Sequence, residues 1–158
     1  MVAERYYISK NYEKSILKYQ EVLRFTPDYG FALNGIGYTY LSKGNRKKAM
    51  HSWKELQKLM QNDSLLWYYE NRSFEEGLHF YLDKAKLNSP QFCTNPVLIS
   101  SIEMLVEEPS EAIKFLKIAY KYNNEDLPIM LTYPIFRPLH TNKEFKEIVT
   151  NVGVTFSN

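Results

Sequence analysis

The sequence predicts an all-α chain in which pairs of antiparallel helices follow one another as repeats. Two stretches near the N-terminus can be aligned at an offset of about 34 residues, a period typical of repeated helix pairs. Pro27 and Gly44 stand where the helical spacing of apolar residues is interrupted. The chain of 158 residues also holds 13 tyrosines and 9 phenylalanines, which supply enough apolar surface for a continuous core.

The repeat is defined by side chains that recur in one register. The positions that correspond are Tyr6, residues 10–15, Tyr19, Val22 and Pro27 in the first stretch, and Tyr40, residues 44–49, Trp53, Leu56 and Gln61 in the second. Agreement in a single register favours a true repeat over an unrelated helical hairpin.

Residue sizes fit two helices joined by a tight turn. Gly37 and Ala49 are small and are expected where the two helices approach most closely. Gly44 suits the turn because glycine accepts a left-handed backbone at little cost. Pro27 lies beyond the end of the preceding helix, where proline is tolerated. The large residues expected to fill the space between and behind the helices are Leu33, Ile36, Tyr40, Trp53 and Leu56.

Residues 30–63 resemble a tetratricopeptide repeat. The positions that match the family signature in kind are Ile36-Gly37, Tyr40, Gly44, Ala49 and Trp53. The departures are Leu33 for the usual Trp, Arg46 for an aromatic residue, Leu56 for Ala and Gln61 for Pro, none of which interrupts a helix pair. A generic helical hairpin is the alternative. The resemblance implies a right-handed α-α superhelix, a tetratricopeptide solenoid of about four helix pairs with a C-terminal capping segment.

We interpret residues 1–158 as a single domain of this type. Its expected parts are a truncated first repeat (1–28), the best repeat (29–63), a degenerate repeat (64–90), a fourth helix pair (94–122) and a C-terminal cap (123–158). By the 34-residue offset Met1 corresponds to Gly35, inside a first helix, so we expect further repeats to precede Met1.

Local signals place the later helices. Ser64 is expected to cap a short helix, and residues 73–76 open the next with a capping-box pattern. Asn95-Pro96 begins another helix, and the turn at residues 108–110 precedes an amphipathic one. In the helix pair at residues 64–90 the positions expected to pack are Gly77, Tyr81 and Ala85. In the pair at residues 94–122 they are Ala112, Ile113, Leu116, Ala119 and Tyr120.

The C-terminal segment begins with a short helix over residues 127–131 and ends with one over residues 142–149, and the prolines between them forbid one continuous helix. Residues 85–152 resemble the closing part of bacterial signalling proteins that end in a tetratricopeptide tail. The residues that carry this likeness are 111–120, Met130, Pro134, Phe136, Pro138-Leu139 and Phe145. The resemblance implies the regulatory part of a larger protein, whose effector is a DNA-binding domain, a protein kinase or an adenylate cyclase.

Residues with catalytic or metal-binding spacing are not found, so we expect neither an enzyme nor a metal or cofactor site. His51, His79 and His140 show no ligand spacing, and His51 and His79 are predicted on outer helix faces. The net charge of +2 argues against direct binding of nucleic acid. The basic run at residues 43–48 is interpreted as a solvated turn, with contact to an acidic partner or a phosphate backbone as the alternative.

The lone Cys93 fits a reducing compartment, and no apolar run approaches the roughly 20 residues that span a bilayer. We therefore predict a cytoplasmic protein without a membrane partner. In the tetratricopeptide family the first helix of each pair lines a concave side. The residues predicted to bind a peptide there are Tyr7, Phe31, Asn34, Tyr38, Leu41, Tyr68 and Arg72, joined by Glu4 and Leu65.

Tyrosine rings offer large contact area at low entropic cost, and Asn34 is suited to bond the backbone of an extended peptide. Plain core packing of the same rings is the alternative. The sequence thus favours a module that binds a protein or peptide through an aromatic groove. The second hypothesis is a structural or dimerising segment of a multidomain regulator, which includes a homodimer.

Overall fold

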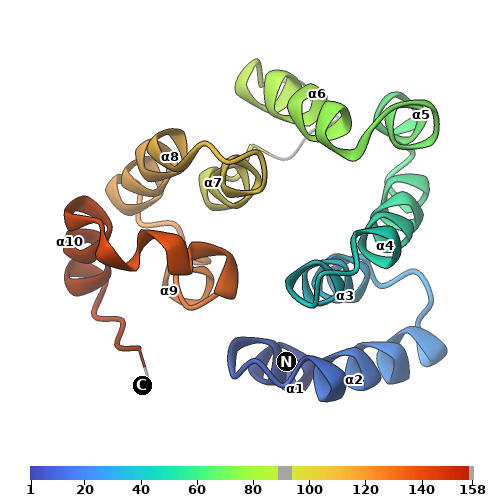
Figure 1. Cartoon of the computed structure of the whole chain (residues 1–158), viewed down its shortest axis with the longest axis horizontal. Helices are drawn as coiled ribbons and strands as arrows, with labels where there is room; N and C mark the ends of the chain where they lie inside the picture. The colour runs from blue at the N-terminus through green and yellow to red at the C-terminus, as the bar shows by residue number, and fades with distance from the viewer. Residues whose placement is uncertain (89–93, 157–158) are drawn as a thin grey trace. The chain divides into compact units, whose positions relative to one another are not determined.

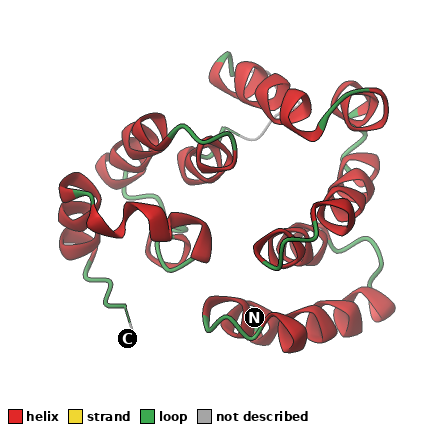
Figure 2. Ribbon diagram, in the orientation of Figure 1, coloured by secondary structure: helices red, strands yellow, loops and turns green. Residues whose placement is uncertain are grey.

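The computed structural model describes residues 1–88 and 94–156, and these residues form ten α-helices and one 3₁₀ helix without a β-strand (Figures 1 and 2). The predicted all-α class is therefore confirmed. Contacts group the chain into two compact units, Met1–Gly77 and Leu78–Asn158. Each unit is described by itself below, and the assignment of residues 1–158 to a single domain stays a prediction.

The first unit is a succession of neighbouring helices. In order they are α1 (Val2–Ile8), α2 (Tyr12–Phe25), α3 (Gly30–Ser42), α4 (Arg46–Leu59), α5 (Asp63–Asn71) and the first residues of α6 (Phe74–Lys86). Each helix from α1 to α4 packs against the next one along the chain. The helix pairs predicted for residues 1–28 and 29–63 are thus present, and Pro27 lies between α2 and α3 as expected.

Asparagine caps begin the second helix of each of the first two pairs. Asn11 accepts a hydrogen bond from the Lys14 backbone nitrogen at 3.4 Å, and Asn45 accepts one from Lys48 at 3.1 Å. These caps recur at the repeat offset. Asn62 caps α5 in the same manner, which makes the prediction of a Ser64 cap wrong, because an asparagine two residues earlier already satisfies the free N–H groups.

Several turns between helices use a residue with a left-handed backbone. Gly44 has φ +79°, as its position in the sequence predicted. Five non-glycine residues adopt the same region at 51–63° and were not predicted. Lysine, glutamine and glutamate give no such signal, whereas the two asparagines among the five are of a type enriched in this region. The left-handed residues are Lys10 after α1, Gly44 after α3 and Gln61 after α4 in the first unit, and Asn88, Glu107, Asn123 and Gly153 in the second unit.

Glycines in the first unit bring helices into close contact beneath aromatic rings. A methyl group added at each of three helical glycines would fall 2.3–2.5 Å from an aromatic side chain of another helix. Ala49 is fully buried, and α3 packs on α4 with Gly37 against Trp53, whereas the closest approach of the two helices at Gly37 and Ala49 stays a prediction. The ring–glycine contacts are Tyr19 over Gly35, Trp53 over Gly37 and Tyr69 over Gly77.

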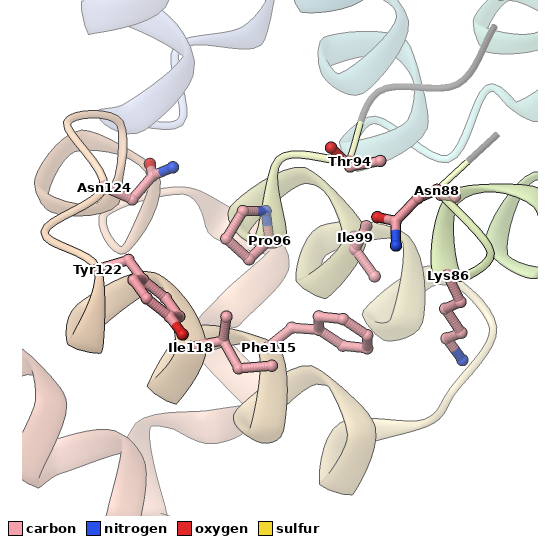
Figure 3. Close-up of a pocket in the computed structure, with 10 residues that line it drawn as sticks. Lys86, Asn88, Thr94, Pro96, Ile99, Phe115, Ile118, Tyr122 and Asn124 are labelled. Atoms are coloured by element: carbon pink, nitrogen blue, oxygen red, sulfur yellow. The ribbon is translucent and has the colours of Figure 1, made fainter. Parts of the chain in front are cut away.

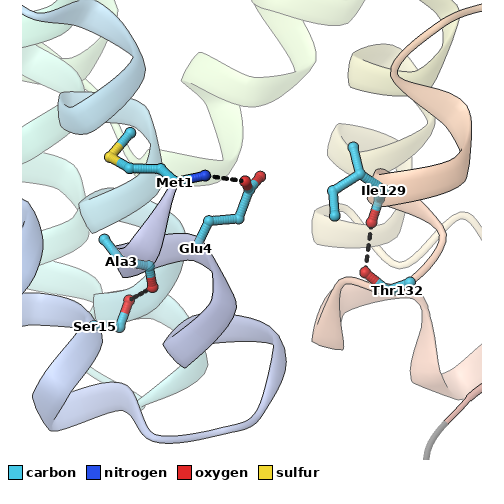
Figure 4. Close-up of polar contacts among 6 residues, drawn as sticks. All are labelled: Met1, Ala3, Glu4, Ser15, Ile129 and Thr132. Carbon is cyan, nitrogen blue, oxygen red and sulfur yellow. Dashed lines mark hydrogen bonds and ion pairs between the residues drawn. The ribbon is translucent and has the colours of Figure 1, made fainter.

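A buried polar contact joins the first two pairs. Ser15 Oγ donates to the Ala3 carbonyl oxygen at 2.9 Å (Figure 4), and it also lies 3.2 Å from Thr39 Oγ1. All of these groups are buried among the side chains of α1, α2 and α3. Thr39 Oγ1 in turn donates to the Gly35 carbonyl oxygen at 2.8 Å, so each buried hydroxyl has a backbone carbonyl as acceptor.

The second unit contains one further helix pair and a closing segment. Its elements after α6 are α7 (Pro96–Leu105), α8 (Pro109–Lys121), α9 (Leu127–Met130), η1 (Pro134–Thr141) and α10 (Lys143–Val152). Asn95 caps α7 as predicted. Pro109 is the first residue of α8 rather than part of the turn, because proline is favourable at that position of a helix.

The closing segment packs on the α7–α8 pair. The 3₁₀ helix η1 contacts α7, and α10 contacts α8 (Figure 1). Phe136 and Phe145 are fully buried there, with ring centroids 6.3 Å apart. The predicted cover over the last pair is therefore confirmed, whereas Tyr120, predicted on the buried face of α8, is exposed.

Candidate protein-binding surface

The predicted binding residues belong to the first helices of successive pairs in the unit Met1–Gly77. They are Tyr7 on α1, Phe31, Asn34, Tyr38 and Leu41 on α3, Tyr68 on α5 and Arg72 directly after α5. The structure separates them into buried, half-buried and exposed residues, and this separation decides which of them a partner can touch.

Tyr7 and Tyr38 are buried, at 1% and 4% exposure. The hydroxyl oxygen of Tyr7 accepts a hydrogen bond from Ser42 at 3.4 Å, and burial raises the pKa of Tyr7 above its ordinary value. Tyr38 meets the Trp53 ring edge-on, with centroids 5.4 Å apart. For these two residues the structure favours core packing, the alternative left open by the sequence.

Asn34 and Leu41 are half-buried on α3. The Asn34 side-chain oxygen accepts a hydrogen bond from Trp53 Nε1 at 3.1 Å. This bond ties α3 to α4 and occupies the oxygen that was expected to meet a peptide. Leu65 and Glu4, also expected to face a groove, are both buried, and Glu4 lies 3.4 Å from the amino group of Met1 (Figure 4).

Of the two aromatic residues of α3 that were predicted to bind, Phe31 is the exposed one, with 48% of its surface accessible. Its ring lies 6.2 Å from that of Tyr29, which precedes α3 and is also exposed. We call these two residues the α3 patch. The sequence reasoning missed Tyr29, which stands at the helix N-cap, where the backbone turns and no helical periodicity indicates a face.

A second group, the α5 patch, consists of the exposed residues Trp67 and Arg72 and the half-buried Tyr68. Trp67 is 49% exposed, and the Tyr68 ring meets it edge-on at 5.3 Å. The Arg72 guanidinium lies 5.9 Å above the indole ring, within the range of a cation–π contact. Three side chains of the types most frequent at interface centres are thus assembled at one surface.

Trp67 was absent from the predicted set, although a signal for it exists. Leu65 and Tyr69 are four residues apart and both are buried, so they define the inner face of α5. A residue midway between them on the helix points away from that face. Periodicity within α5 could therefore have identified Trp67 as exposed.

The basic run at residues 43–48 is largely engaged within the chain. Lys43 forms an ion pair with Glu13 at 2.9 Å, and Arg46 forms one with Glu75 at 2.8 Å. The Lys48 ammonium lies 5.4 Å from the ring centroid of Tyr40. These contacts agree with the interpretation as a solvated turn.

A cavity of about 410 Å³ lies in the second unit, lined by the end of α6, the start of α7, and α8 with the residues that follow it (Figure 3). Lys86 on its wall forms an ion pair with Glu103 at 2.6 Å, and Glu103 is buried. The same ammonium lies 5.8 Å from the ring centroid of Phe115. This ion pair neutralises the buried carboxylate of Glu103 and ties α6 to α7, so both residues have a structural role.

Within the described residues, no group of three or more His, Cys, Asp or Glu side chains could hold a metal ion. His51 and His79 are exposed, as their spacing predicted. Cys93 lies outside the described residues. In the part of the chain that the structure describes, no helix combines the length and apolar character needed to cross a bilayer.

Comparison of the chain with protein-family models, with curated proteins and with solved structures gives no match. The resemblance to tetratricopeptide repeats therefore rests on the residues of this sequence.

Proposed function

We propose that the chain is a protein-interaction module that binds a peptide or protein segment through the α3 and α5 patches. The observation that carries the proposal is the α5 patch, where Trp67 stays half exposed while Tyr68 and Arg72 hold its ring in place. A fixed aromatic ring loses little freedom on binding and buries a large apolar area.

The proposal includes a tetratricopeptide-type arrangement, in which helix pairs stack as a right-handed superhelix and first helices share the concave side. Support comes from structural features that recur at the repeat offset. Lys10 and Gly44 both have a left-handed backbone, and Asn11 and Asn45 both cap the following helix. In this proposal the module is the regulatory part of a cytoplasmic bacterial signalling protein without catalytic activity of its own.

Selection of a phage-displayed peptide library on the full chain tests this function. Peptides enriched on the chain are expected to lose at least tenfold in affinity when Trp67→Ala removes the indole, because residues at interface centres cost roughly 2 kcal/mol or more when truncated. Phe25→Ala is the matched control, since Phe25 is a highly exposed aromatic residue of the same unit outside both patches.

A selection whose peptides bind the Trp67→Ala and Phe31→Ala variants as tightly as the original chain would contradict the proposal. Light scattering addresses the dimerisation alternative. A dimer that forms at micromolar concentration and dissociates in the Trp67→Ala variant would assign the patches to a second copy of the chain instead.

A further inference from the structure

A second cavity, of about 430 Å³, lies on α4 beside the first residue of α6. We call it the α4 pocket, and its lining residues are Arg46, Lys47, Met50, His51, Lys54 and Phe74. None of them belongs to the α3 or α5 patch. The pocket therefore goes beyond the proposed function and does not depend on it.

The apolar part of the α4 pocket is held rigidly. Phe74 stacks on the Trp53 ring, with centroids 5.4 Å apart and planes only 4° from parallel. Trp53 is buried and is fixed by its hydrogen bond to Asn34. Met50 lies half-buried beside Phe74 and offers a polarisable surface that adapts to an inserted side chain.

The rim of the α4 pocket is cationic. Lys47 and Lys54 stand three residues before and four residues after Met50, so all three side chains share one face of α4. The structure gives neither lysine an ion-pair partner within the described residues, whereas Arg46 is paired with Glu75. No acidic residue lines the cavity, and His51 on its wall is exposed.

We propose that the α4 pocket binds an acidic segment of a protein partner, with an apolar side chain on Met50 and Phe74 and acidic side chains beside Lys47 and Lys54. Charge complementarity with the two lysines selects the acidic residues. Because Met50 lies between Lys47 and Lys54 along α4, the pocket also selects an apolar residue between the acidic ones. A nucleic acid would gain little here, because the neighbouring cations Lys43 and Lys48 are already engaged by Glu13 and Tyr40.

Fluorescence anisotropy with a fluorescein-labelled peptide, Glu-Asp-Glu-Phe-Glu-Asp-Glu, tests the proposal on the full chain. The double variant Lys47→Gln with Lys54→Gln is expected to weaken binding about three- to tenfold, the loss of two solvent-exposed ion pairs. The same peptide with Gln and Asn in place of its acids is expected to lose as much. Replacing its Phe by Ala tests the apolar contact and is expected to weaken binding further.

The double variant Lys10→Gln with Lys14→Gln removes the same charge elsewhere in the first unit and serves as the matched control. An equal loss in this control would overturn the site, because binding would then follow net charge alone. Single-stranded oligothymidine that binds more tightly than the peptide, with the same dependence on Lys47 and Lys54, would overturn the acidic-protein assignment. Trp67→Ala is expected to leave this peptide's affinity unchanged, which separates the test from that of the proposed function.

Discussion

The two units of the chain build helix pairs in different ways. In Met1–Gly77 three contacts between neighbouring helices are made at glycines, and an aromatic side chain of the other helix lies over Gly35, Gly37 and Gly77. In Leu78–Asn158 the α7–α8 contact uses small residues that keep a Cβ atom. There Ser100 Oγ donates to the Ala112 carbonyl oxygen at 2.9 Å, and both residues are fully buried. The α1–α2 contact of the first unit has the same kind of bond, from Ser15 to Ala3, so the contacts of aromatic side chains with glycines are what distinguish that unit.

The units also differ in where their aromatic rings come from. In the first unit rings project from the paired helices themselves, so some fill the space above glycines and others remain at the surface. In the second unit the two fully buried rings, Phe136 and Phe145, come from the segment that closes over α7 and α8, although Tyr81 of α6 is buried as well. The comparison teaches that a helix pair can be completed either by its own aromatic residues or by a later segment of the chain.

The largest expected effect is on the closing segment. Phe136→Ala removes a fully buried ring and is expected to lower the free energy of unfolding by about 3–5 kcal/mol, since the cavity adds to the lost burial. Urea denaturation followed by far-UV circular dichroism measures it. Both tryptophans lie in Met1–Gly77, so tryptophan fluorescence shows separately how that unit responds.

Ile129→Ala is the control for this prediction, because Ile129 is an exposed residue of the same unit and should cost little when truncated. A loss below about 1 kcal/mol for Phe136→Ala would mean that the closing segment contributes little to the second unit.

An intermediate effect is expected at the glycine contacts. Gly37→Ala places a methyl group 2.5 Å from Trp53 Nε1, and relief of this overlap must displace a ring that is packed on both sides. We expect a destabilisation of about 1–3 kcal/mol, although alanine favours the helix by about 1 kcal/mol. Tryptophan fluorescence during urea denaturation measures the change in the unit concerned.

Gly30→Ala provides the matched control in the same helix. Its added methyl group would lie 3.3 Å from a terminal methyl of Leu56, a flexible side chain that can move aside. This variant should change stability by no more than about 0.5 kcal/mol. Equal losses for the two variants would show that α3 requires glycine for reasons other than ring contact.

The smallest effect concerns pH. Partial burial, and then the nearby positive charge of Arg137, lower the pKa of His140 below its ordinary 6.5. The unfolded chain therefore takes up a proton more readily, and stability present above pH 6.5 declines as the pH falls through that value. Urea midpoints at pH 7.5 and 5.5 should show a small decrease.

In the variant His140→Phe, which keeps a ring stacked between Phe145 and Phe156, this part of the decrease should vanish. An unchanged pH dependence would assign the decrease to other groups.

Much of the fold was predictable because its signals are local. The turn at Gly44 and the capping box of Ser73 with Glu76 depend on hydrogen bonds within a few residues, and both are present. The left-handed residues Lys10 and Glu107 were not predictable, because the packing of the flanking helices imposes their backbone and their side chains do not indicate it.

The sequence by itself determined the helix pairs, their breaks and the small residues at which they meet, since periodicity and capping are properties of a short stretch of chain. Only the tertiary structure decided which rings a partner can reach. Tyr38 and Trp67 are both large aromatic residues on first helices, yet contact with α4 buries one and packing through Leu65 and Tyr69 leaves the other exposed. The exposure of a side chain depends on the neighbours that cover it, and those neighbours are set by contacts between helices.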